Sequence, residues 1–281
     1  MTKIAVLTDS STYLPSRLVE EHAIHVIPLV LLWGDQALRD GLEITPAQFY
    51  LRLEEDQNLP TTTQPTPEDF LRVYNHLAES HDAIVAVLIS SELSGTVSSA
   101  QVAASSFDRI PVRVVDSRLT SMGLGFAVLA AARAALKDRD LDEVEHAAMS
   151  AASRSRVMFV VDTLEYLHRG GRIGGASRLL GTALSIKPLL HLKDGRVDAL
   201  ERVRTKGKAI SRMLDLATEY VAGRPVRAAV VHANACGEAE SLQTQIADRF
   251  ECLELFVTEL SPVIATHTGP GTLGVGVCPE T

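Results

Sequence analysis

A hydroxyl-rich turn after a predicted buried strand holds the residues best placed for binding chemistry. Residues 83–88 are apolar throughout, and the chain then passes through Ser94, Gly95 and Thr96 into small residues at helical spacing. The first turn of a helix has backbone N–H groups without partners inside the helix, and the helix dipole adds partial positive charge there. The two hydroxyls supply further donors, so this turn predicts an anion site.

The same turn has a simpler interpretation. Ser91 or Ser94 can cap the helix by accepting a hydrogen bond from its first N–H groups, as serine does in many proteins. The turn also lacks the lysine of a phosphate-binding Walker loop. Anion binding and plain capping therefore both remain open from these residues alone.

A second hydroxyl-rich loop, residues 58–67, contains Thr62 and Thr63 among three prolines. Proline fixes φ, so the loop has few conformations to lose when a ligand binds. We expect Thr66 to cap the following helix, with Pro67 in its first position. The two preceding threonines are either turn residues or ligand donors.

His267 lies in a third loop, residues 266–271, whose glycines permit close backbone approach. A histidine in such a turn is either structural or functional. The sequence contains no G-x-S-x-G or H-E-x-x-H motif and no paired aspartates at metal-ligand spacing. We therefore predict a binding site with no catalytic residue, no metal and no cofactor.

The composition limits the class of protein. With 281 residues, 46% hydrophobic and 22% charged, the chain is long enough for one large globular domain or two modest ones. The net charge of −8 argues against nucleic-acid binding. Three cysteines without a C-x-x-C pair predict neither a disulfide framework nor a thiolate zinc site. No apolar stretch approaches the roughly 20 residues of a membrane span, so we expect a cytoplasmic protein.

The charge is unevenly distributed along the chain. Residues 165–208 contain ten Lys or Arg and four Asp or Glu, a local +6 in an acidic protein. A basic surface of this kind suits an acidic partner, a phosphate-bearing ligand or an anionic membrane. A solvated face without any partner is the alternative.

Strands alternate with helices in the first half of the chain. Apolar runs at 4–8, 83–88 and 112–115 predict an α/β domain over residues 1–154, with a mainly parallel sheet, helices on both faces and polar turns at one edge. Residues 25–33 are expected to form one strand, which Pro28 restricts to an edge position.

The pattern changes near Arg154, where we place the domain boundary. Residues 155–281 predict an α+β domain with a helix of small residues at about 176–184. Asp194-Gly195 between two strand-like runs predicts a type I′ hairpin.

Six blocks of sequence together resemble the DegV family, in order and spacing, across the whole chain. They are residues 8–11, 62–65, 91–96, 115–117, 164–167 with 170–174, and 267–271. Members of that family are bacterial fatty-acid-binding proteins, including the acyl-binding subunits of two-part fatty acid kinases. The resemblance therefore implies a two-domain α/β protein with an acyl chain in an apolar tunnel.

The resemblance also implies which residues meet the lipid. Thr62 and Ser94 would contact the carboxylate, with His267 close by. The full lipid-binding set would be Thr62, Thr63, Ser94, Gly95, Thr96 and His267. The family commonly has Thr-Ser-Gln-Pro where this chain has Thr-Thr-Gln-Pro, so Thr63 adds a methyl that would narrow the head-group site.

The resemblance implies that Arg172 lies at the surface near the tunnel opening. The local +6 charge separately predicts that Arg169 and Arg172 dock the partners at this mouth. The expected partners are a long-chain fatty acid, the catalytic subunit of a fatty acid kinase and, transiently, a membrane surface. The chain itself would be a non-catalytic subunit that presents the carboxylate for phosphorylation. Two alternatives are a phosphotransferase that holds phosphate at the Ser94 helix, and a small-metabolite sensor or interaction protein.

Overall fold

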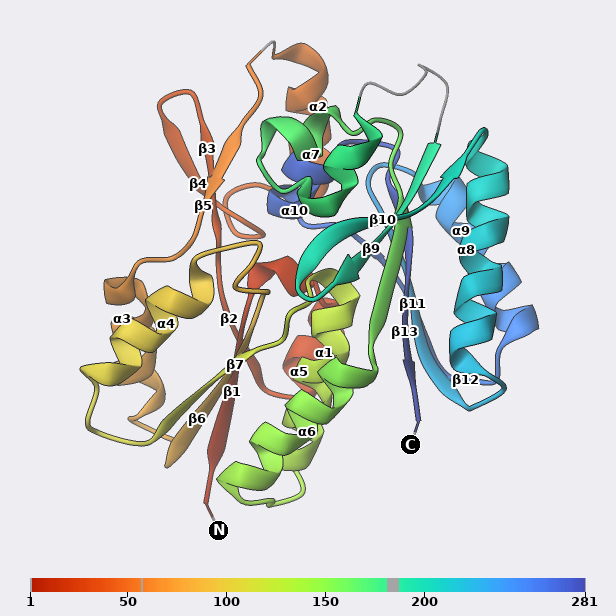
Figure 1. Cartoon of the computed structure of the whole chain (residues 1–281). Helices are drawn as coiled ribbons and strands as arrows, with labels where there is room; N and C mark the ends of the chain where they lie inside the picture. The colour runs from red at the N-terminus through yellow and green to blue at the C-terminus, as the bar shows by residue number, and fades with distance from the viewer. Residues whose placement is uncertain (1, 57, 181–186, 281) are drawn as a thin grey trace.

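The computed structural model describes residues 2–56, 58–180 and 187–280. The strands form a four-stranded sheet in the order β2-β1-β6-β7, a three-stranded sheet in the order β4-β3-β5, and a six-stranded sheet in the order β10-β9-β8-β13-β11-β12. The helices α5 and α6 lie between the two larger sheets (Figure 1). The predicted α/β class is confirmed.

The four-stranded sheet is parallel throughout. Its strands are β1 (Ile4–Asp9), β2 (Ile24–Ile27), β6 (Ala83–Leu88) and β7 (Val112–Asp116). Side chains of a strand alternate between the two faces of its sheet. Ile4 and Val6 accordingly pack in one apolar cluster, and Ala5 and Leu7 pack in another. Helices cover both faces, which explains why β1 and β6 are buried at every position.

Two pairs of helices make these faces. One pair is α3 (Pro67–Leu77) with α4 (Thr96–Ser105), and the other is α5 (Ser121–Ala135) with α6 (Leu141–Arg154). The predicted cap of α3 is confirmed, because the Thr66 side chain accepts a hydrogen bond from the backbone N–H of Asp69. Three short helices complete this half: η1 (Ser10–Thr12), α1 (Ser16–Glu21) and α2 (Pro46–Glu55).

The three-stranded sheet corrects one prediction. Residues 25–33 do not form a single strand, because β2 ends at Ile27 and β3 (Val30–Trp33) belongs to another sheet. Pro28 separates the two strands. The predicted edge position is confirmed for β2. It is wrong for β3, which lies between β4 (Gln36–Arg39) and β5 (Thr61–Thr63).

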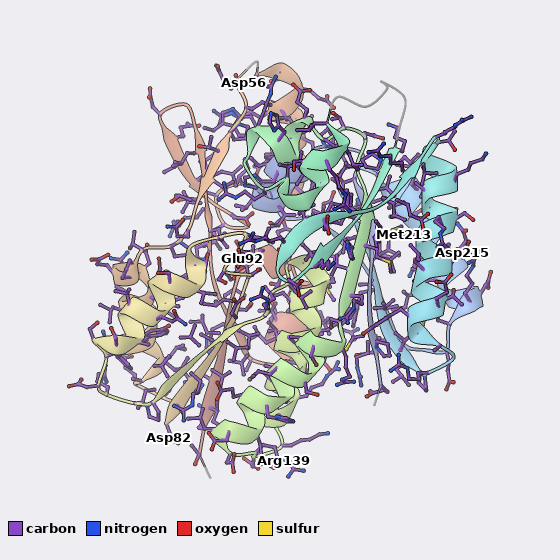
Figure 2. The ribbon with its side chains drawn as sticks, viewed as in Figure 1. Asp56, Asp82, Glu92, Arg139, Met213 and Asp215 are labelled. Atoms are coloured by element: carbon purple, nitrogen blue, oxygen red, sulfur yellow. The ribbon has the colours of Figure 1, made fainter. Side chains whose placement is uncertain are left out.

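The six-stranded sheet occupies the second half of the chain. Its strands are β8 (Arg156–Val160), β9 (Lys187–Lys193), β10 (Arg196–Val203), β11 (Val226–His232), β12 (Cys252–Glu259) and β13 (Leu273–Pro279). The helices α8 (Lys206–Val221) and α9 (Cys236–Arg249) cover its outer face (Figure 1). Met213 on α8 packs in the apolar cluster between α8 and this sheet (Figure 2).

The inner face of the six-stranded sheet shares a core with the first half. Phe159 and Val231 belong to the same apolar cluster as Val6 and Leu124. The sheets divide where α6 ends at Arg154, but the core is continuous across that point. The boundary between two domains near residue 154 stays a prediction.

The remaining elements lie near the junction of the two halves. They are α7 (Glu165–Arg169), the 3-10 helix η2 (Gly174–Leu179) and α10 (Pro262–Thr268). The small-residue helix expected at 176–184 is a 3-10 turn up to Leu179, and its last four positions lie outside the described residues. The hairpin prediction holds, because Asp194 and Gly195 both have positive φ. Across the described ranges, no helix is both long and apolar enough to cross a membrane.

Candidate functional site

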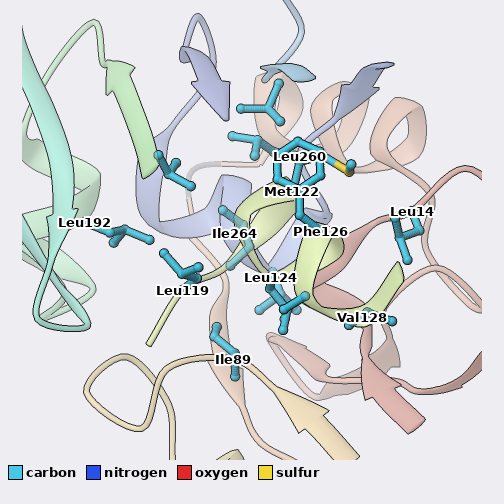
Figure 3. Packing of buried hydrophobic residues seen from close by; sticks show 14 of the residues in the cluster. Leu14, Ile89, Leu119, Met122, Leu124, Phe126, Val128, Leu192, Leu260 and Ile264 are labelled. Carbon is cyan, nitrogen blue, oxygen red and sulfur yellow. The ribbon is translucent and has the colours of Figure 1, made fainter. Parts of the chain in front are cut away.

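A pocket partly open to solvent lies among the three sheets, and its empty space, including solvent at the opening, is about 830 Å³. Apolar side chains from both halves of the chain form most of its wall. Ile89, Leu192, Leu260 and Ile264 are four of these, and they come from four different segments (Figure 3). A concave apolar space with a few polar groups is the usual form of a small-molecule site.

Thr62 and His267 meet on this wall although 205 residues separate them. Thr62 Oγ1 and His267 Nε2 are 2.8 Å apart, within hydrogen-bond distance. Antiparallel pairing with Leu31 fixes Thr62 in β5. The Ser261 side chain caps α10, which carries His267 in its last turn.

The environment of His267 keeps its ring neutral at pH 7. Burial, with a smaller contribution from Arg172, lowers the pKa of His267 to about 4. Nδ1 is buried and has no hydrogen-bond partner among the described residues. Gly170 closes this side of the ring, because a Cβ at that position would lie 2.1 Å from Nδ1.

Ser94 also lines the cavity, and it does not cap the helix that follows. Gly95 is the N-cap residue of α4 and has no side-chain cap. Ser94 Oγ instead shares a 2.8 Å hydrogen bond with Thr96 Oγ1, while Ser91 Oγ donates to Asp116 Oδ2 at 2.5 Å. The plain-capping interpretation of this turn is therefore wrong.

The polar turns of the parallel sheet meet as expected, but only one of them lines the cavity. Asp9 Oδ2 accepts from the backbone N–H of Ile89 at 2.7 Å, and Asp116 Oδ1 accepts from that of Ser91 at 3.2 Å. The two carboxylates thus hold the Ser94 loop in place from behind. Asp9 is fully buried, and this burial raises its pKa.

Some, but not all, of the site residues predicted from the sequence lie on the wall of this cavity. Thr62, Thr63, Ser94, His267 and Arg172 line one cavity. Gly95 and Thr96 stand behind Ser94: Thr96 is buried, and a Cβ on Gly95 would lie 3.0 Å from Gln64 Nε2. Arg169 has an exposed side chain paired with Glu165 at 2.5 Å.

Arg172 is half-buried. Its Nε donates to the carbonyl of Leu93 at 3.1 Å and its Nη1 to that of Gly170 at 2.7 Å. The guanidinium therefore ties the Ser94 loop to the turn after α7. This places a positive charge near His267 on the cavity wall.

Ion pairs with acidic residues elsewhere in the chain neutralise part of the positive charge of the basic stretch at 165–208. Arg196 pairs with Glu92 at 2.5 Å, at the centre of the molecule in Figure 2. Lys187 pairs with Asp162 and Lys206 with Glu238. Three acidic side chains from outside the stretch therefore offset part of its local +6.

Comparisons with known proteins show which family the chain belongs to. A family model described as "Uncharacterised protein, DegV family" matches residues 3–280. The chain belongs to the DegV family. A DegV domain-containing protein of Streptomyces coelicolor is 45% identical to it over 276 residues, which is 98% of each chain.

Solved DegV structures share the whole fold. A DegV family protein from Thermus thermophilus, described by its fatty acid binding, has a TM-score of 0.94 and 39% identity over all of both chains. Bacillus subtilis DegV, described as a fatty acid binding protein, has a TM-score of 0.93 and 35% identity over the same extent.

The sequence-based interpretation missed two features of this DegV cavity. Thr120 and Ser121 line it, and their only signal was a hydroxyl pair after the polar turn that ends β7. The run from Gly269 to Gly274 also has G-x-G-x-x-G spacing. It joins α10 to β13, whereas the dinucleotide-binding motif joins a strand to a helix, so the spacing carries no such function here.

Proposed function

We propose that this chain binds a long-chain fatty acid in the cavity and presents its carboxylate to a separate fatty acid kinase. One observation carries the proposal: hydroxyls and a neutral imidazole cluster on the wall of a mostly apolar cavity, in a chain with the fold of fatty-acid-binding DegV proteins. The acyl chain would lie along the apolar wall. The carboxylate would meet Thr62 and Ser94.

Burial of the acyl chain supplies most of the affinity. Each CH₂ removed from water contributes about 0.8 kcal/mol, so a chain of on the order of 16 carbons gains roughly 12 kcal/mol before entropy costs. A bilayer buries the same chain to a similar extent, so the cavity and a membrane compete for the fatty acid on roughly equal terms. The polar groups then need only to orient the head group.

The Thr62–His267 pair suits a carboxylate. With its proton on Nε2, the ring donates to Thr62 Oγ1, and the threonine hydrogen is then free to donate to a ligand oxygen. The ring is neutral at pH 7 because its pKa is about 4. Ser94 supplies a second hydroxyl, and Arg172 adds positive charge although its hydrogen bonds to Leu93 and Gly170 both go to backbone carbonyls.

A hydroxyl cradle also fits the role of a presenting subunit. A bidentate arginine would occupy both carboxylate oxygens, including the one that must attack ATP. Hydroxyl donors leave an oxygen accessible to the kinase. Arg169, exposed beside the turn that carries Arg172, is the proposed docking residue.

The decisive experiment is mass spectrometry of organic extracts from the purified, folded protein. We expect near-stoichiometric fatty acid of about 14 to 18 carbons, for which burial contributes on the order of 10–14 kcal/mol. If no fatty acid is extracted and none binds at micromolar affinity, lipid binding is excluded. A co-purifying polar metabolite would instead support the sensor alternative.

The kinase role needs its own measurement. Acyl phosphate should form only when the loaded protein, ATP and a fatty acid kinase catalytic subunit are all present. ATP hydrolysis or phosphatase activity by the protein alone would support the phosphotransferase alternative. Equal acyl phosphate formation from free fatty acid without this protein would contradict the presenting role.

A further inference from the structure

A second pair of hydroxyl side chains belongs to the cavity wall and has no hydrogen-bond partner within the described part of the chain. Ser121 is 3% exposed, and neither its Oγ nor the Oγ1 of Thr120 has a hydrogen-bond partner among the described residues. Both residues belong to the cavity wall. A buried hydroxyl without a hydrogen bond is costly, and most such groups in proteins have a partner. Both oxygen atoms are buried within the wall, so a ligand oxygen meets them when their side chains turn toward the cavity.

The helix α5, which begins at these two residues, adds to the attraction of this site for a ligand oxygen. α5 starts at Ser121 and has 15 residues, and Thr120 is its N-cap residue without a side-chain cap. The N–H groups of its first turn and its dipole therefore face the same space as the two hydroxyls. This combination favours an oxygen on the ligand over a methylene.

Thr62 and His267 belong to a different layer of the fold from Thr120 and Ser121. α10, which carries His267, packs on α7, β3 and β5. α5 packs on β1, β6, β11 and β13. Figure 3 labels Leu192 and Ile264, two apolar residues of the cavity wall, together with Leu119, which directly precedes Thr120 in the chain.

We propose that Thr120 and Ser121 form a second polar site that binds an oxygen substituent, a hydroxyl or an oxo group, along the acyl chain. This inference rests on the proposed fatty-acid binding and names a ligand class within it: oxygenated long-chain acids. A hydroxyl can both donate and accept, so the pair accommodates either substituent. An unsubstituted chain also fits, but it leaves both protein hydroxyls unpaired.

Other hydroxyls in the wall provide a contrast. Thr268 Oγ1 donates to the carbonyl of Ile264 at 3.3 Å, and Thr272 Oγ1 donates to that of Thr268 at 3.0 Å. Both residues line the cavity, and each already donates its hydroxyl hydrogen to a backbone carbonyl. They are therefore matched controls for Thr120 and Ser121.

The first test needs no variant. Binding of stearate and of a series of monohydroxystearates, each substituted at a different carbon, is measured by calorimetry on delipidated protein. We expect one position, or two adjacent ones, to bind at least as tightly as stearate, and the others to bind roughly tenfold or more weakly because their hydroxyl is buried unpaired. The favoured position should lie beyond carbon 3, away from the head group.

Variants then assign the preference to the two residues. Ser121 has a φ of +51°, which glycine adopts without strain, so Ser121→Gly removes the hydroxyl with the backbone conserved. Ser121→Gly and Thr120→Val should each weaken the favoured isomer by roughly two- to tenfold and leave stearate unchanged. Thr268→Val should leave the positional preference intact.

The outcomes separate the two proposals. If stearate itself does not bind, the proposed function fails. If stearate binds but every hydroxylated isomer is weakened to the same extent, or the preference falls at carbon 2 or 3, the second site is refuted. A preference that survives both Ser121→Gly and Thr120→Val also refutes it.

Discussion

Two polar clusters lie on opposite sides of the loop that follows β6. In the cavity cluster, defined by Thr62, Ser94 and His267, the hydroxyls bond to other side chains: Thr62 Oγ1 to His267 Nε2 and Ser94 Oγ to Thr96 Oγ1. In the buried cluster, defined by Asp9, Ser10 and Asp40, the oxygens hold backbone: Asp9 accepts from Ile89 and Ser11, and Ser10 Oγ accepts from the N–H of Leu29.

The difference shows what makes a polar turn a site. Each cluster contains a serine from a polar turn after a strand of the parallel sheet, Ser94 after β6 and Ser10 after β1. The oxygens of Asp9 and Ser10 in the buried cluster bond to the chain itself, so these groups contribute to stability, although Asp40 Oδ1 has no partner among the described residues. The cavity cluster retains donors that face an apolar space, so its groups remain available for a ligand.

The largest expected effect separates the clusters by stability. Asp9→Ala leaves the N–H groups of Ile89 and Ser11 without their acceptor, which should lower the free energy of unfolding by roughly 4 kcal/mol. Urea denaturation measures this. Ser94→Ala is the matched change in the cavity cluster, and it should alter stability by less than about 0.5 kcal/mol while weakening fatty-acid binding. Equal stability losses in the two variants would break the distinction.

The stability that each cluster contributes should also depend on pH, with opposite signs for the two clusters. Burial raises the pKa of Asp40 to about 7 from 3.8, so the ionised form is disfavoured in the folded state and stability falls as pH rises from about 4 to 7. The pKa of His267 is lowered from 6.5 to about 4, so the unfolded chain takes up its proton first. Stability from His267 is therefore complete above about pH 6.5 and is lost as pH falls toward 4.

Single variants separate the effects of Asp40 and His267 on the free energy of unfolding. Each effect is on the order of 3–4 kcal/mol when the full pKa shift is expressed. Thermal unfolding without ligand, measured from pH 4 to 7.5, should show a steeper rise of stability with pH for Asp40→Asn than for the native protein. His267→Gln should change the slope in the opposite direction. Parallel curves for all three proteins would contradict the assignment of either group.

A smaller effect concerns the glycine behind the imidazole. Gly170→Ala places a Cβ against His267 Nδ1, so the ring must move away from Thr62, at a cost of about 1–3 kcal/mol in stability. Fatty-acid affinity should fall with it. Gly171→Ala is the control, because a Cβ there meets no atom within 4 Å and only the positive φ is strained. If both variants bind fatty acid equally well, the contact with His267 has no role.

The smallest effect tests Arg169 outside the cavity against Arg172 on its wall. Arg169→Glu should slow acyl phosphate formation with the kinase by roughly two- to tenfold at low salt, and less at high salt, because surface charge mainly affects association. Fatty-acid affinity should not change. Arg172→Gln should change that affinity, since its guanidinium ties the loop of Leu93 to Gly170. A native kinase rate for Arg169→Glu at low ionic strength would remove Arg169 from docking.

Much of the local structure follows from the sequence alone. Apolar runs predicted the strands of the parallel sheet, and Thr66-Pro67 predicted the start of α3. Asp194-Gly195 predicted the hairpin between β9 and β10. These features depend on neighbouring residues, whose backbone preferences and side-chain periodicity are fixed by their types. The blocks that resemble the DegV family also lie in the sequence, and the family match confirms them.

Only the tertiary structure decided which polar groups a ligand can reach. It brought Thr62 to His267 across 205 residues and turned Asp9 into the support of a loop. It also left Ser121 in a cavity wall with no hydroxyl partner in the described ranges. It also placed the two sides of Pro28 in different sheets. Whether a hydroxyl is free depends on which distant backbone group packs against it, and a pattern of neighbouring residues carries no record of that packing.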